Sequence, residues 1–151
     1  MLGGTVEVDE VFIVKKKHDN QTVVLGAIEK TSGRVAVRAV SDRLQGISDR
    51  FILDQVQAAS LVCTDANPVY EHLSEFFGYG YEVCNHGMGH FRPTDRIENV
   101  WMRLRRFIRK IYHHVWKEHL PRLLKEFQAR INVPEAFTSP TSFLTYVFQI
   151  S

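Results

Sequence analysis

Three acidic side chains stand where a folded chain would normally place apolar residues. Asp9 and Glu98 lie inside apolar segments, and Asp65 directly follows the run Leu61-Val62-Cys63-Thr64. A buried carboxylate is costly unless cations or hydrogen bonds compensate it. Dispersed acids that converge in a fold are well explained by a shared divalent metal ion, which promotes phosphate chemistry. The sequence therefore predicts a metal site that acts on nucleic-acid phosphate.

Positive charge is concentrated in residues 92–130. This segment holds eleven Lys or Arg and four acids, a net charge of +7 in a chain of formal net charge +2, so the remainder carries −5. A basic stretch is often only a solvated helix face, but this asymmetry also suits a polyanion. DNA or RNA is therefore a predicted partner.

A helix predicted over residues 95–115 combines an apolar stripe with a row of cations. At about 100° per residue, one face holds Ile97, Trp101, Leu104, Ile108, Ile111 and Val115. Glu98, Met102, Arg105 and Arg109 run beside this stripe. Glu98 and Arg105 lie about 10 Å apart along the axis, which suits metal at one end and phosphate at the other. Arg103, Arg106 and Lys110 lie elsewhere on the surface and extend a phosphate-binding patch.

Glu98 and Asp65 each have a structural explanation as well. Asp95 and Glu98 fit a capping box, which is the preferred explanation when this helix is considered alone. Asp65 precedes Asn67-Pro68, a common turn sequence.

Asp9 favours the metal site over these explanations. Its strand is apolar on both faces, which indicates a central strand, and yet it carries Glu7, Asp9 and Glu10 together. A purely structural strand seldom combines these features.

The order of the predicted elements indicates an α/β fold. Strands are predicted over 5–14, 22–30, 34–41, 60–64 and 79–84, and helices near 47–56, after Asn67-Pro68, over 95–115 and over 117–131. The turn Thr31-Ser32-Gly33 joins the second and third strands as a hairpin. Three antiparallel strands followed by helix-connected strands are the order of the ribonuclease H-like fold, so we predict a mixed five-stranded sheet flanked by helices. Residues 1–131 are predicted to form this catalytic domain, and residues 132–151 a turn-rich tail with a short apolar helix.

Length and composition narrow the class of protein. The chain has 151 residues, of which 44% are hydrophobic, enough for the core of one domain. It shows no apolar run long enough to span a membrane and no signal peptide, so an intracellular protein is expected. Cys63 and Cys84 are expected to be buried thiols rather than a disulfide.

Four motifs occur in a characteristic order. They are Val8-Asp9-Glu10, Thr64-Asp65 followed by Tyr70, Asn85-His86, and Ile97-Glu98-Asn99-Val100-Trp101 with Arg105 seven residues after Glu98. Over about residues 5–130 the chain thereby resembles the DDE transposases of bacterial insertion sequences, in the ISXO-two-like group related to Merlin transposons.

The resemblance implies an enzyme that cuts and joins DNA with a two-metal site of Mg²⁺ or Mn²⁺. Asp9 and Asp65 would be the catalytic aspartates and Glu98 the third acid. Some family members assign the third position to an Asn three residues earlier, which makes Asp95 the second choice here. Arg105, where the family usually has Lys, would contact DNA near the scissile phosphate.

Two further residues have competing interpretations. Cys84, His86 and His90 lack the paired spacing of a zinc site, so His86 is interpreted as a loop residue near the active site that contacts DNA. Trp101 is interpreted as a core residue rather than a platform for base stacking.

Family members usually carry an N-terminal zinc-binding and DNA-binding region, so the chain is expected to be the catalytic half of a transposase. It is also expected to work as a homo-oligomer on DNA. The alternatives are a catalytically inactive DNA-binding relic and a ribonuclease H-like nuclease. The expected location is the cytoplasm, associated with the nucleoid, for a bacterial protein, and the nucleus for a eukaryotic one.

Overall fold

The helices and strands follow the predicted order closely. The computed structural model describes residues 1–13, 22–40, 45–65, 70, 72–73, 77–83, 95–112, 115 and 117–150. The strands are β1 (Thr5–Ile13), β2 (Thr22–Glu29), β3 (Val35–Val40), β4 (Leu61–Thr64) and β5 (Gly80–Val83). The helices are α1 (Gln45–Gln55), α3 (Asp95–Tyr112), α4 (Leu120–Asn132), the short 3₁₀ helix η2 (Pro134–Phe137) and α5 (Pro140–Ile150).

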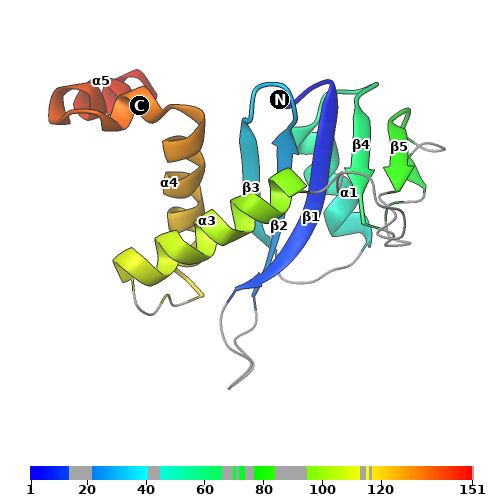
Figure 1. Ribbon diagram of the computed structural model, residues 1–151, viewed down its shortest axis with the longest axis horizontal. Coiled ribbons are helices and arrows are strands. Elements are labelled where there is room, and N and C mark those ends of the chain that lie inside the picture. Colours follow the sequence, from blue (N-terminus) through cyan, green and yellow to red (C-terminus); the bar gives the residue numbers. More distant parts are fainter. Residues whose placement is uncertain are drawn as a thin grey trace.

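The strands form one mixed sheet in the order β3-β2-β1-β4-β5 (Figure 1). β2 is antiparallel to both of its neighbours, whereas β1, β4 and β5 run parallel. Gly33 supplies the positive φ of +73° that the β2–β3 turn requires, and its N–H donates to the Glu29 carbonyl at 2.9 Å. The predicted five-stranded mixed sheet flanked by helices is confirmed, and β1 lies at its centre.

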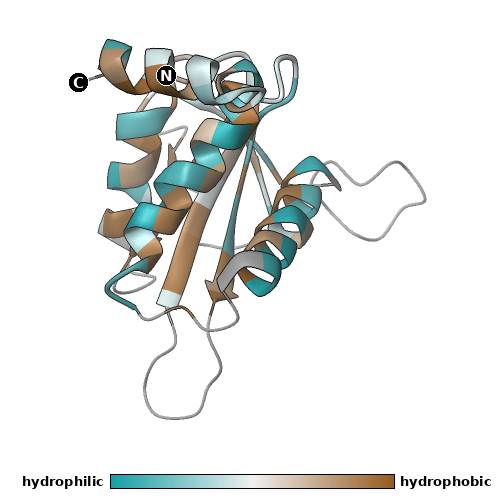
Figure 2. Ribbon diagram, turned by 90° about the vertical axis from the view of Figure 1, so that its left-hand side faces the viewer, coloured by the Kyte–Doolittle hydropathy of each residue, from teal (hydrophilic) through white to brown (hydrophobic). Residues whose placement is uncertain are grey.

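Side chains alternate between the two faces of β1. Val6 and Val8 belong to a core cluster shared with α1, whereas Val11 and Ile13 belong to a second cluster shared with α3 and α4. Figure 1 shows α3 crossing the sheet on the face opposite to α1. In Figure 2 hydrophobic and hydrophilic residues alternate along the flanking helices, as expected for helices with one buried side.

Helix α4 closes the free edge of the sheet at β3. The Asn132 side chain accepts a hydrogen bond from Val35 N–H and donates one to the Val35 carbonyl, each at 2.8 Å. Gln128 accepts from Val37 N–H at 3.0 Å. Two helical side chains thus replace the missing neighbouring strand, which keeps this edge from pairing with another chain.

Some predicted boundaries differ from the structure. The helix predicted over 117–131 begins only at Leu120, because Pro121 occupies its first turn, where a proline lacking an N–H is tolerated. The helix predicted over 95–115 is described from Asp95 to Tyr112, and the two residues that follow lie outside the described part of the structure. The helix predicted after Asn67-Pro68 lies mostly outside the described residues.

The cysteines, the C-terminal tail and the length of the helices are also subjects of prediction. Cys63 is buried with a free thiol, and Cys84 lies outside the described residues. The tail contains η2 and α5, and α5 exposes Phe143, Leu144 and Phe148. Within the described residues, no helix combines the length and the apolar character needed to cross a bilayer.

Candidate active site

Asp9 and Asp65 come together where β1 and β4 run side by side. Asp9 lies in the second half of β1, and Asp65 directly follows the last residue of β4. Burial raises the pKa of Asp9, and the charges of Asp65 and Glu10 add to this effect, while hydrogen bonds from the Trp101 side chain and the Glu10 backbone oppose it. The resulting pKa is about 6. Two of the three predicted acids therefore lie close enough to repel each other electrostatically.

Trp101 contacts Asp9 directly. Its indole Nε1–H donates to Asp9 Oδ2 at 2.8 Å, and the residue is only 4% exposed. A residue this deeply buried cannot serve as a platform for stacking DNA bases. Trp101 is a core residue that also hydrogen-bonds a candidate catalytic acid.

Glu7 is a second acid on β1 that contacts α3. It is 1% exposed, and its Oε2 accepts Ile97 N–H at 2.9 Å while its Oε1 lies 3.7 Å from Lys30 Nζ. Burial raises its pKa, whereas the Ile97 N–H and the Lys30 charge act in the opposite direction. A carboxylate here satisfies a free N–H in the first turn of α3 and interacts favourably with the helix dipole. The two-residue alternation of a strand places Glu7 on the same face as Asp9, but its contact with α3 is not visible in the sequence.

Glu10 and Tyr70 connect the segment after Asp65 to β1. The Tyr70 hydroxyl donates to Glu10 Oε2 at 3.3 Å, and Tyr70 is 2% exposed. Burial and the nearby Glu10 charge raise the pKa of Tyr70, so its hydroxyl keeps the proton that it donates. This bond joins two of the motif residues, Glu10 beside Asp9 and Tyr70 five residues after Asp65.

Glu98 lies on the exposed side of α3. It lines a groove of about 370 Å³ together with Asn99, Trp101, Met102 and Arg105. Glu98 and Arg105 thus share one groove, as their seven-residue spacing predicts. In the described part of the chain no three His, Cys, Asp or Glu side chains form a metal-binding group, so the structure does not bring Glu98 into a cluster with Asp9 and Asp65.

Two other predicted residues receive no structural test. Asp95 begins α3, but its side chain is outside the described part of the structure. His86 lies outside the described residues, together with Cys84 and His90.

The five predicted DNA-contacting cations of α3 are all exposed; they are Arg103, Arg105, Arg106, Arg109 and Lys110. None of them forms an ion pair with another described residue. Uncompensated cations along one helix create a positive potential that attracts phosphate.

The donor atoms near Asp9 suit a hard divalent cation. Asp9 and Asp65 offer carboxylate oxygens only, which are the ligands that Mg²⁺ and Mn²⁺ prefer. The Asp9 carboxylate is partly buried and repelled by its two acidic neighbours, and a cation there would relieve this repulsion. The residues present therefore fit such a metal.

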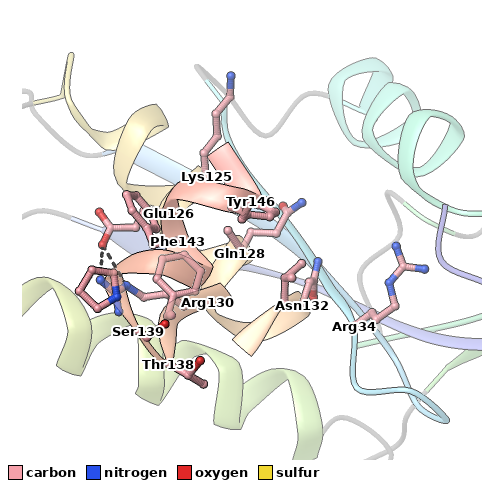
Figure 3. A pocket seen from close by; sticks show the side chains of 14 residues that line it. Arg34, Lys125, Glu126, Gln128, Arg130, Asn132, Thr138, Ser139, Phe143 and Tyr146 are labelled. Atoms are coloured by element: carbon pink, nitrogen blue, oxygen red, sulfur yellow. Dashed lines mark hydrogen bonds and ion pairs between the residues drawn. The ribbon is translucent and has the colours of Figure 1, made fainter. Parts of the chain in front are cut away.

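A larger hollow of about 1040 Å³ lies elsewhere, between α4, η2 and α5 (Figure 3). Its lining includes Arg34, Lys125, Asn132, Phe143 and Tyr146, and the ion pair between Arg130 and Glu126 spans 2.9 Å at its side. It contains none of the three candidate acids, so its size does not mark the catalytic centre.

Comparison with known families gives one match over most of the chain. The model of the ISXO2-like transposase domain matches residues 1–132. None of the curated proteins matches the chain in sequence.

Solved structures show the same fold at low sequence identity. The catalytic core domain of HTLV-2 integrase, a dimeric form in complex with magnesium, has a TM-score of 0.67 at 10% identity, covering 88% of each chain. The core domain of BIV integrase has a TM-score of 0.63 at 16% identity, covering 87% of this chain and 84% of that one. A chain of the simian T-cell lymphotropic virus intasome in complex with PP2A regulatory subunit B56 gamma has a TM-score of 0.65 at 13% identity, covering 88% of this chain and 49% of that one. These similarities place the chain in the ribonuclease H-like fold.

Proposed function

The chain belongs to the ISXO2-like transposase domain family and is a transposase catalytic domain, and we propose that Asp9, Asp65 and Glu98 are its catalytic acids. The observation that carries the proposal is the placement of Asp9 and Asp65 at adjacent parallel strands, close enough for one charge to raise the pKa of the other. Paired carboxylates of this kind are expected to hold divalent metal for phosphodiester cleavage and strand transfer.

Mg²⁺ or Mn²⁺, bound as a pair, is the proposed cofactor. The magnesium in the HTLV-2 integrase core supports this choice. Bound divalent metal supplies Lewis-acid stabilisation of the attacking and leaving oxygens in an in-line displacement at phosphorus. The chain supplies the rest: Asp9 and Asp65 provide the negative charge, and Arg105 holds the phosphate from the other end of the groove. No covalent protein nucleophile is needed.

Glu98 is the proposed third acid, with Asp95 as the alternative. Glu98 lines the same groove as Trp101, whose indole bonds Asp9, and as Arg105. Separate Glu98→Gln and Asp95→Asn variants distinguish the two. Mn²⁺-dependent cleavage should be lost only in the variant whose substituted residue holds the metal.

DNA is the proposed partner, with α3 as the contacting helix. Arg105→Ala should weaken binding to a DNA duplex and lower the salt slope of log K by about 1, the effect of losing one phosphate contact. Arg122→Ala on α4, which removes an exposed cation elsewhere, is the matched control. An equal loss in both variants would show that α3 is not the specific contact. His86 is a further proposed contact.

A homo-oligomer on DNA is the proposed working assembly. It is supported by the dimeric and trimeric forms of the HTLV-2 integrase core and by the simian viral intasome. We propose residues 1–131 as the catalytic domain and residues 132–151 as a separate tail.

The test of the catalytic assignment is DNA cleavage and joining in Mn²⁺. Nicking of a supercoiled plasmid measures cleavage, and insertion of a labelled DNA duplex into that plasmid measures strand transfer. Asp9→Asn and Asp65→Asn should abolish both, while Glu118→Gln, an exposed acid in the turn before α4, should change neither. Retained activity in the two Asp variants would refute the assignment.

The same assay separates the alternative functions. A ribonuclease H-like nuclease would nick the plasmid without joining the labelled duplex. An inactive relic would bind DNA in a salt-sensitive manner, without activity and without Mn²⁺ binding that depends on Asp9.

A further inference from the structure

Two acids of β1 contact two positions of α3 in matching register. Glu7 accepts the Ile97 N–H at 2.9 Å, and Asp9 accepts the Trp101 Nε1–H at 2.8 Å. The acids are two residues apart on a strand, a rise of about 6.6 Å, and their donors are four residues apart on a helix, a rise of about 6 Å. The two bonds therefore fix both the position of α3 along β1 and its rotation about its own axis.

The indole ring of Trp101 packs against the backbone of a glycine. Gly26 of β2 pairs with Asp9 across the sheet. A Cβ on Gly26 would lie 2.2 Å from the Cη2 atom and 2.8 Å from the Cζ2 atom of the Trp101 ring. The ring thus lies directly over the Gly26 backbone, where its N–H reaches the neighbouring carboxylate.

A purely structural residue at this position would not need the N–H group. Trp101 packs in the same cluster as Ile97, Val100 and Leu104, and an apolar ring would fill that space as well. The N–H instead occupies one oxygen of a carboxylate whose pKa burial has already raised, and so limits rotation of that carboxylate. Groups that hold metal-binding side chains in one orientation are a general requirement of precise metal sites.

We propose that Trp101 is a positioning residue of the active site, which orients the Asp9 carboxylate through its indole N–H while Gly26 provides the room for its ring. This inference rests on the proposed function, in which Asp9 holds divalent metal. Glu98 precedes Trp101 by three residues and lines the same groove.

Trp101→Phe tests the role of the N–H, because it keeps an aromatic ring and removes the donor. Titration calorimetry with MnCl₂ should show a Kd about 10- to 100-fold higher than that of the wild-type protein, the usual effect of losing a group that orients a metal ligand. Leu104→Ala is the structural control, since Leu104 is fully buried in the same cluster and its side chain has no hydrogen-bond donor that could orient Asp9. It should lower the melting temperature while leaving the Kd for Mn²⁺ within about 2-fold of wild type.

Gly26→Ala tests whether the space above Gly26 is needed for the Trp101 ring. The added methyl group must displace Trp101, so Mn²⁺ affinity should fall as it does in Trp101→Phe. Gly46→Ala in α1 is the matched control, because nothing lies within 4 Å of its added Cβ. It should leave Mn²⁺ affinity unchanged.

The outcomes separate this inference from the proposed function. An unchanged Kd in Trp101→Phe, or an equal rise in Leu104→Ala, would overturn the positioning role of Trp101. Asp9→Asn is measured alongside. If it binds Mn²⁺ as tightly as wild type, then the proposed metal site itself is refuted.

Discussion

Asp9→Asn should stabilise the metal-free protein at neutral pH, although it removes a candidate catalytic acid. Burial, together with the charges of Asp65 and Glu10, raises the pKa of Asp9 from its ordinary value of 3.8 to about 6. The ionised carboxylate is therefore less favourable in the folded state than in the unfolded state. Asn is close in shape to the protonated acid, and its side-chain carbonyl can still accept the Trp101 N–H.

The size of the effect follows from the two pKa values. One pKa unit corresponds to about 1.36 kcal/mol, so a pKa of about 6 against 3.8 gives about 3 kcal/mol. Between these values the unfolded chain releases its proton while the folded chain keeps it, so stability falls as pH rises from about 4 to 6. Asp9→Asn should therefore match wild type below pH 4 and exceed it by about 3 kcal/mol above pH 7, which for this chain length is about 6 to 12 °C in melting temperature.

Thermal unfolding in EDTA between pH 4 and pH 8 measures the difference. Glu118→Gln, which alters an exposed acid, should stay within about 0.5 kcal/mol of wild type throughout. Saturating Mn²⁺ should reduce or reverse the advantage of Asp9→Asn, because only the protein that binds the metal gains stability from it. A melting temperature for Asp9→Asn at pH 8 in EDTA that equals or falls below wild type would refute the reasoning.

Four further substitutions, at three positions, test the packing of the fold, each by urea denaturation. The free energy of unfolding of Glu7→Gln should lie within about 1 kcal/mol of wild type, because Gln keeps an acceptor for the Ile97 N–H. Glu7→Leu should lower it by about 1–3 kcal/mol, because that buried donor is left unsatisfied. Equal losses in the two variants would contradict the capping role of Glu7. Leu104→Ala should lose about 2–5 kcal/mol, since it leaves a cavity beneath α3, and a loss below about 1 kcal/mol would show that this face is not tightly packed. Asn132→Ala should lose about 1–3 kcal/mol by removing both hydrogen bonds to Val35 at the β3 edge, and an unchanged stability would show that water replaces them fully.

Much of the fold could be predicted because it depends on local patterns. The apolar residues of β1 place it inside the sheet, and Gly33 marks the hairpin by its positive φ. The helical spacing of Ile97, Trp101 and Leu104 identifies the face of α3 that the structure buries. The predicted start of α4 at residue 117 is three residues too early, because the structure places Pro121 in the first turn of the helix.

The candidate site was predictable only in part. The apolar surroundings of Asp9 singled it out, and ordered motifs suggested Asp65 and Glu98 as its partners. The proximity of Asp65 to Asp9 follows from β4 pairing parallel to β1, a contact between segments far apart in the chain.

The sequence by itself determined the kinds of side chain available for catalysis and the elements that carry them, because periodicity and residue type act over a few neighbouring positions. The tertiary structure alone decided that Glu7 caps α3 and that the Trp101 indole bonds Asp9 above Gly26. The two bonds link residues 90 and 92 positions apart in the chain. Such contacts depend on the packing of a whole helix against a sheet, which no local pattern specifies.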